Sequence, residues 1–213
     1  MKRSILSLAL GLLASPAWAN GPPATLRYNP PADAERPLPK QLTVTADAND
    51  YVVDLTFNRL PWGDDCKNRC ASVTLFLDTD NNRGTGLQLG KLPETGADLM
   101  VTIQGDRDFK EKSSQALLRA RVRQLTSELR SPEEGELIAD LNQRLDPERL
   151  VGHGTRVTLR LDATSLSIPA GKTMRVVYHP PADKALEATT RGMLSGVVPG
   201  SPKVEKGKKP KRR

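Results

Sequence analysis

Three kinds of residue are scarce in this chain, and each shortage argues against a class of function. Its 213 residues include two Trp, three Tyr and three Phe, which is little material for the aromatic platforms on which sugar rings stack. Two histidines and two cysteines leave few nucleophile–base pairs for covalent catalysis. The sequence also has no H-E-x-x-H motif, no phosphate-binding P-loop and no G-x-S-x-G elbow. An enzyme is therefore disfavoured, although catalytic residues can also be scattered along a sequence.

Long apolar runs are confined to the amino-terminal segment. Two basic residues precede an apolar stretch from Ile5 to Leu13, and Ala17-Trp18-Ala19 fits an A-x-A cleavage site. These features predict a signal peptide over residues 1–19, with the mature chain beginning at Asn20. No later run approaches the length of a transmembrane helix. We therefore expect a periplasmic or secreted protein with no transmembrane segment after signal cleavage.

The net charge of +7 is concentrated at the carboxyl-terminal end. Residues 203–213 hold seven basic side chains and one glutamate, so residues 20–202 are close to neutral. A segment with like charges and few apolar residues does not pack, which predicts a disordered basic tail over residues 201–213. The tail would bind an anionic envelope polymer or glycan, or act only as a solubility tail; nucleic acid is not expected. The residues assigned to surface binding are Lys206, Lys208, Lys209, Lys211, Arg212 and Arg213.

The mature chain is expected to begin with a proline-rich segment, and its two cysteines follow some way after it. Residues 20–40 contain six prolines, which predicts an extended leader before a folded domain over residues 41–200. Cys66 and Cys70 are the only cysteines, and in an oxidising compartment they are expected to form a disulfide. The C-x-x-x-C spacing differs from the C-x-x-C of redox motifs, so the bridge would shape a turn rather than carry chemistry.

Most of the predicted domain alternates between apolar and polar residues, with turn residues between the alternating runs. Such short segments predict an all-β fold, namely an antiparallel β-sandwich of jelly-roll or immunoglobulin-like type. The eight strand candidates are 42–46, 51–57, 72–77, 97–103, 119–123, 135–141, 155–161 and 173–178. In 119–123, Ala120 and Val122 are expected to face inward and three arginines outward.

Two segments also fit a helix. Apolar residues recur at helical spacing over 114–129, which competes with the strand at 119–123. Residues 182–194 follow Pro180-Pro181 and allow one short carboxyl-terminal helix on the rim of the sandwich.

The most informative motif follows the strand at 72–77. Asp78, Asp80 and Asn82 place side-chain oxygens at alternate positions of a turn, and Asp98 opens the next strand. Calcium prefers six to eight oxygen ligands, and a D-x-D-x-N turn can supply several of them. A metal-free turn, in which Asp and Asn accept hydrogen bonds from their own backbone, is the alternative.

The stretch from Val73 to Asn82, together with Thr85-Gly86 and Gly96-Ala97-Asp98, resembles exported bacterial β-sandwich domains of the DOMON group and the family-nine carbohydrate-binding modules. The resemblance implies a sandwich in which Asp78, Asp80, Asn82 and Asp98 bind a metal or fix the loop. We therefore predict an exported, non-enzymatic, calcium-stabilised binding or envelope-associated module. A glycan-binding accessory domain and an enzyme acting on envelope polysaccharide are the alternatives. The sequence does not indicate the oligomeric state.

Overall fold

The computed structural model describes most of the chain between residues 24 and 198. Within that span, the residues it leaves out are 33, 48–49, 64–68, 91, 93, 106–117, 169–172 and 180–193. The predicted signal peptide, the basic tail, Cys66 and most of the segment proposed as a carboxyl-terminal helix lie outside the described residues.

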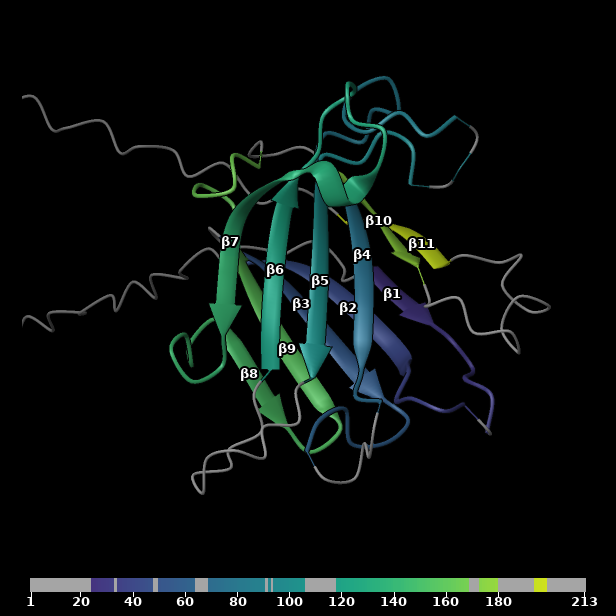
Figure 1. Ribbon diagram of the computed structural model, residues 1–213, viewed down its shortest axis with the longest axis vertical. Helices are drawn as coiled ribbons and strands as arrows, with labels where there is room; N and C mark the ends of the chain where they lie inside the picture. Colours follow the sequence, from purple (N-terminus) through teal and green to yellow (C-terminus); the bar gives the residue numbers. More distant parts are fainter. Residues whose placement is uncertain are drawn as a thin grey trace, which may run out of the picture.

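The described part is an antiparallel β-sandwich, which confirms the predicted fold class (Figure 1). One 3-10 turn, η2 (Pro132–Glu134), accompanies eleven strands. The strands are β1 (Ala24–Arg27), β2 (Pro39–Asp47), β3 (Asp50–Phe57), β4 (Ser72–Asp78), β5 (Leu99–Gly105), β6 (Leu118–Gln124), β7 (Glu136–Asn142), β8 (Leu150–His153), β9 (Arg156–Asp162), β10 (Met174–His179) and β11 (Leu194–Val198). None of the described residues belongs to a helix long and apolar enough to cross a membrane.

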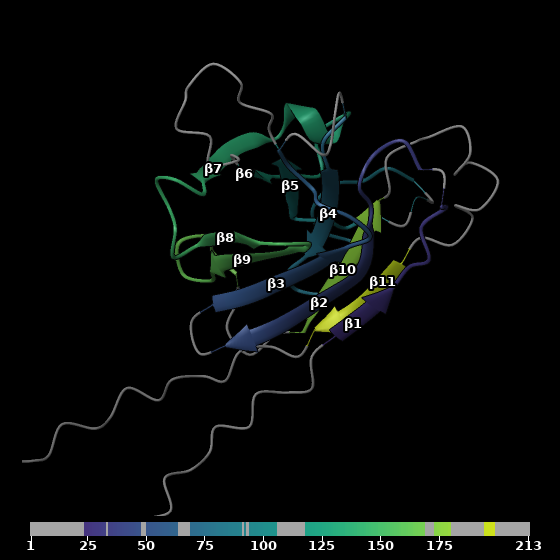
Figure 2. The same cartoon turned by 90° about the horizontal axis from the view of Figure 1, so that it is seen from below.

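The chain passes between two sheets three times. One sheet has five strands in the order β1-β2-β3-β9-β8, and the other has six in the order β11-β10-β4-β5-β6-β7. Neighbours in the sequence form hairpins, whereas the pairs β3–β9 and β4–β10 join distant segments. The edge strands β1 and β11 lie against each other at one side of the sandwich (Figure 2).

Buried and exposed side chains alternate along several strands, and the buried ones form the core between the two sheets. On β3 the side chains of Tyr51, Val53, Leu55 and Phe57 are buried while the intervening residues are partly exposed. On β6, Ala120 and Val122 are fully buried, as predicted, and the arginines lie on the opposite face. Burying one large apolar side chain contributes about 1.5–3 kcal/mol, so the inward rows of both sheets stabilise the sandwich.

A second apolar cluster lies on the outer face of the six-stranded sheet. Phe76 on β4, Met100 on β5 and Val177 on β10 face away from the main core, yet they are buried. Leu87 and Ala97, from the long connection between β4 and β5, cover them. The connection after β4 is therefore packed onto the sheet, and this packing fixes the position of the acidic motif that it carries.

Three sequence-based expectations differ from the structure. The proline-rich leader contains a strand, because Ala24–Arg27 lacks proline and can pair with β2 as an edge strand. Order also resumes before Gln41, since β2 starts at Pro39 and Leu38 is fully buried. The helical interpretation of 114–129 is wrong for its described part, where 118–124 form β6 between β5 and β7. The eight predicted strands are present, and β1, β8 and β11 were not predicted.

Candidate metal centre

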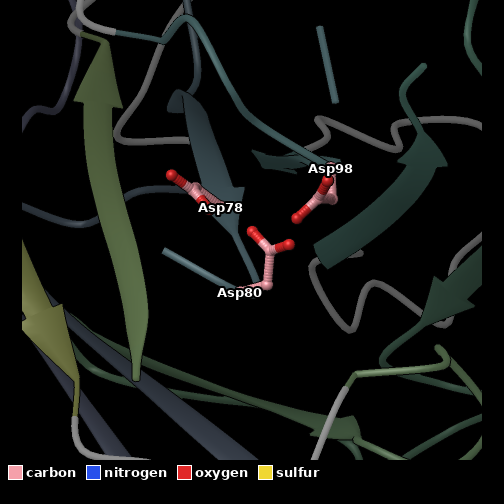
Figure 3. Close-up of side chains that lie close together, drawn as sticks. All are labelled: Asp78, Asp80 and Asp98. Atoms are coloured by element: carbon pink, nitrogen blue, oxygen red, sulfur yellow. The ribbon is translucent and has the colours of Figure 1, made fainter. Parts of the chain in front are cut away.

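Three of the four predicted metal ligands meet at one end of the six-stranded sheet. Asp78 ends β4, Asp80 follows it by two residues, and Asp98 directly precedes β5. Since Leu77 pairs with Leu99, the next position along the ladder sets Asp78 beside Asp98. One carboxylate oxygen from each of the three residues lies within 4.8 Å of the others. Figure 3 shows the carboxylates of Asp80 and Asp98 facing each other next to Asp78.

The turn that carries Asp80 is held by hydrogen bonds from its own backbone and from the Thr85 hydroxyl. The Asn82 N–H donates to Asp78 Oδ1 at 2.9 Å and to Asp80 Oδ1 at 3.0 Å. The Thr85 hydroxyl donates to Asp80 Oδ1 at 3.1 Å. Asn81 takes a positive φ of 54°, a backbone conformation in which Asn is enriched. The metal-free interpretation therefore has support, because these bonds hold the carboxylates without an ion.

Asn82 is the predicted ligand that the carboxylate cluster does not include. Its Oδ1 accepts a hydrogen bond from the Gly84 N–H at 3.0 Å, and the residue is exposed. A metal ligand role for Asn82 would require this oxygen to be shared with the Gly84 amide. That role remains a prediction.

Asp98 fixes the start of β5 to the turn after β4. Its Oδ2 accepts hydrogen bonds from the Thr79 N–H at 2.8 Å and from the Thr79 hydroxyl at 2.7 Å. Its own N–H donates to Leu77 O at 2.8 Å, which continues the ladder between β4 and β5. Asp98 is therefore positioned from both sides before any ligand is considered.

Arg175 is a buried partner of the cluster that the sequence did not reveal. It lies opposite Asp78 on β10, and its Nε and Nη2 lie 3.1 Å and 3.0 Å from Asp78 Oδ2. Nη2 also donates to Thr95 O in the covering loop. Both side chains are buried, with 8% of Arg175 and 1% of Asp78 exposed. The buried pair joins three segments, namely β4, β10 and the covering loop.

Burial changes the acidity of two of the three carboxyl groups. Burial raises the pKa of Asp78 above the ordinary value, even though the Asn82 amide and Arg175 favour its charged form. Burial also raises the pKa of Asp98, with a further contribution from the negative charge of Asp80, while bonds from Thr79 oppose the shift. Ionisation of Asp98 is therefore less favourable in the folded chain than in the unfolded chain.

This shift predicts a pH-dependent effect of Asp98→Asn in the presence of a chelator. A carboxyl with a raised folded-state pKa contributes stability below the ordinary value of about 3.9, and that contribution is lost as the pH rises through the raised value. Relative to the wild type, Asp98→Asn should therefore gain stability as the pH rises from about 4 to about 7. Urea unfolding in EGTA at a series of pH values measures the difference.

Asp162→Asn is the matched control for this experiment. Hydrogen bonds from the Ser165 hydroxyl, and from the Ser165 and Thr164 amides, lower the pKa of Asp162. The Asp162 carboxyl stabilises the folded chain above its ordinary pKa, and that stabilisation is lost as the pH falls. Asp162→Asn should therefore lose stability relative to the wild type as the pH rises. Slopes of the same sign for the two variants would contradict the assignment for Asp98.

Most of the remaining predicted site residues lie outside the described residues. Cys70 is described and Cys66 is not, so their disulfide stays a prediction. The six basic residues assigned to surface binding belong to the undescribed tail and are likewise untested. No protein-family model, characterised protein or solved structure matches this chain. The proposed likeness to DOMON and family-nine carbohydrate-binding domains therefore rests on the sequence motif alone.

Proposed function

We propose that this protein is an exported, non-enzymatic binding module whose sandwich is stabilised by calcium. The observation that supports the metal is the meeting of Asp78, Asp80 and Asp98 at one end of the sheet. Three carboxylates beside one guanidinium leave two negative charges when all are ionised. One divalent cation would neutralise them, and carboxylate oxygens are the ligands that calcium prefers.

Such an ion would act on stability rather than on a reaction. It would connect the end of β4, the following turn and the start of β5, which the hydrogen bonds of Thr79 and Asp98 already bring together. Burial is the main cause of the raised pKa of Asp98, and the ion would relieve the smaller contribution that comes from repulsion by Asp80. The proposed site is therefore a structural calcium site within a binding module.

Calcium should raise the melting temperature of chelator-treated protein. Extracellular calcium modules have dissociation constants of about 10⁻⁴–10⁻³ M, so 10 mM calcium should add about 1.4–2.7 kcal/mol. For a domain of this size that corresponds to an increase of roughly 3–10 °C. Differential scanning calorimetry across a calcium titration measures the shift.

Asp80→Ala should abolish the calcium shift, because it removes one of the three carboxylates that would hold the ion. Asp162→Ala, which removes a carboxylate from a hydrogen-bonded turn elsewhere, should keep the shift. An unchanged melting temperature of the wild type throughout the titration would refute the calcium site.

A glycan-binding accessory domain is the second candidate function. It is favoured by an open depression on the outer face of the six-stranded sheet, where Thr74, Thr102 and Gln104 lie beside Phe76 and Met100. Export to the periplasm or the exterior, and contact of the basic tail with anionic envelope polymers, belong to the same proposal.

A further inference from the structure

Three arginines surround a cavity at the other end of the six-stranded sheet from the carboxylate cluster. Ser72 begins β4, Gly105 ends β5 and Arg119 lies at the start of β6, so the cavity occupies the end at which β5 finishes. Its volume is about 410 Å³. The lining consists of Arg36, Arg69, Cys70, Ala71, Ser72, Gln104, Gly105 and Arg119.

The floor and one wall of this cavity are built into the fold. The Gly105 N–H donates to Ala71 O at 2.9 Å, and the Ala71 N–H donates to Pro61 O at 2.9 Å. Arg36 stands two residues before Leu38, which is fully buried and exchanges hydrogen bonds of 3.0 Å with Asn58. These contacts fix the backbone around the cavity independently of any ligand.

The charges around the cavity favour an anion. Arg69 pairs with Glu35, and Arg119 pairs with Asp140 at 2.8 Å. Neither carboxylate lines the cavity, and no described lining residue is acidic. The Arg36 Nε is buried and makes no hydrogen bond with any described residue. Three guanidinium groups beside two carboxylates leave an excess positive charge, and guanidinium groups suit the planar oxygens of carboxylate, sulfate and phosphate.

A second cavity of about 480 Å³ adjoins the first along the sheet face. The two share Ser72 and Gln104, and the second continues over Thr74 and Thr102 towards Phe76 and Met100. Its lining also includes two arginines of β6 and two acidic residues, namely Arg121, Arg123, Glu94 and Glu133. From Gln104 to Met100 the strand advances about 13 Å. Hydroxyl, amide and guanidinium groups therefore continue along the sheet face over a length that exceeds one small anion.

We propose that the two cavities form one binding site for an acidic oligosaccharide, with an anionic substituent among Arg36, Arg69 and Arg119. The hydroxyl groups of the sugar rings would hydrogen-bond with Gln104, Thr102 and Ser72. The proposal deepens the binding role proposed above and does not depend on calcium, because the carboxylate cluster lies at the opposite end of the sheet.

The test is isothermal titration of the full chain at 0.15 M salt, both in EGTA and in calcium. The probes are tetragalacturonate and sulfated maltotetraose, with unmodified maltotetraose and inorganic sulfate for comparison. Arg36→Gln/Arg69→Gln should weaken binding of at least one acidic tetramer by roughly tenfold or more, since each lost contact is a charge-assisted hydrogen bond. Thr102→Ala, which changes a residue that lines only the second cavity, should weaken the same tetramer and leave sulfate binding unchanged.

Arg156→Gln/Arg160→Gln is the matched control. These arginines lie on the outer face of the five-stranded sheet and are accompanied by Asp54 and Asp50, so the control removes the same charge and leaves the basic tail intact. It should bind the acidic tetramer within about twofold of the wild type, because long-range charge effects are screened at this salt concentration.

Two groups of results would overturn the proposal. The first is no detectable binding of either acidic tetramer, or equal weakening by the two double variants. The second is binding of maltotetraose or sulfate as tightly as the acidic tetramer. Arg119→Gln provides an independent variant if the double variant does not fold. A calcium shift without tetramer binding would reject this site alone, whereas tetramer binding without a calcium shift would reject only the metal centre.

Discussion

Arg175→Ala is expected to lower the free energy of unfolding by about 3–5 kcal/mol, because it leaves the Asp78 carboxylate buried without its guanidinium partner. Asp78 is 1% exposed, so water cannot replace the lost interactions. Thr95 O in the covering loop loses a donor as well. For a domain of this size the melting temperature should fall by roughly 6–20 °C. Urea denaturation in EGTA provides the free energy, and calorimetry provides the melting temperature.

Two comparison variants separate the buried charge from a general effect of removing arginine. Arg156 pairs with Asp54 at 3.0 Å on the surface, with 62% of its side chain exposed, so Arg156→Ala should cost less than about 1 kcal/mol. Asp78→Leu/Arg175→Met removes both charges, and its loss should be smaller than that of Arg175→Ala alone. A similar cost for Arg156→Ala and Arg175→Ala would show that the buried pair has no special role.

Gly86→Ala should destabilise the chain by about 3 kcal/mol and weaken calcium binding. Gly86 has a φ of 61°, and a Cβ there would stand 2.2 Å from Ala97 O and 2.8 Å from Asp98 Oδ1. The left-handed conformation costs an alanine about 1–2 kcal/mol, and the displaced backbone adds about 1–3 kcal/mol. The displacement acts on the Leu87–Ala97 bridge and on Asp98 itself.

Gly90→Ala isolates the conformational part of this cost. Gly90 has a φ of 70°, but a Cβ at that position meets nothing within 4 Å. Its cost should therefore be about 1–2 kcal/mol, with an unchanged affinity for calcium. Unfolding curves in EGTA and calcium titrations of both variants make the comparison. Equal costs for the two substitutions would mean that the covering loop moves away from Asp98 without penalty.

The locations of most strands could be predicted from local sequence because a strand buried on one face has a period of two. Buried and partly exposed side chains alternate along β3, β6 and β9. The inward row found on β6, Ala120 and Val122, is the predicted one. The three missed strands lack a comparable signal. β1 and β8 have four residues each, and β8 includes a glycine, so neither displays enough alternation to stand out.

Part of the candidate metal centre could be predicted because several of its residues are close together in the sequence. Asp78, Asp80 and Asn82 lie close together in the sequence, so their place in one turn is a local property. Sequence also showed that the β6 arginines face away from the core. It could not show that Arg119 shares a cavity with Arg36 and Arg69, which come from two other segments.

The sequence alone determined the all-β class, most strand positions, the inward faces and the acidic turn, since each depends on residues within a few positions of one another. Only the tertiary structure decided which strands are neighbours and in what register. That choice placed Arg175 against Asp78, 97 residues away in sequence, and folded the connection after β4 over Phe76 and Met100. The physical reason is that pairing and packing across such separations depend on the simultaneous burial of many side chains, which no local pattern specifies.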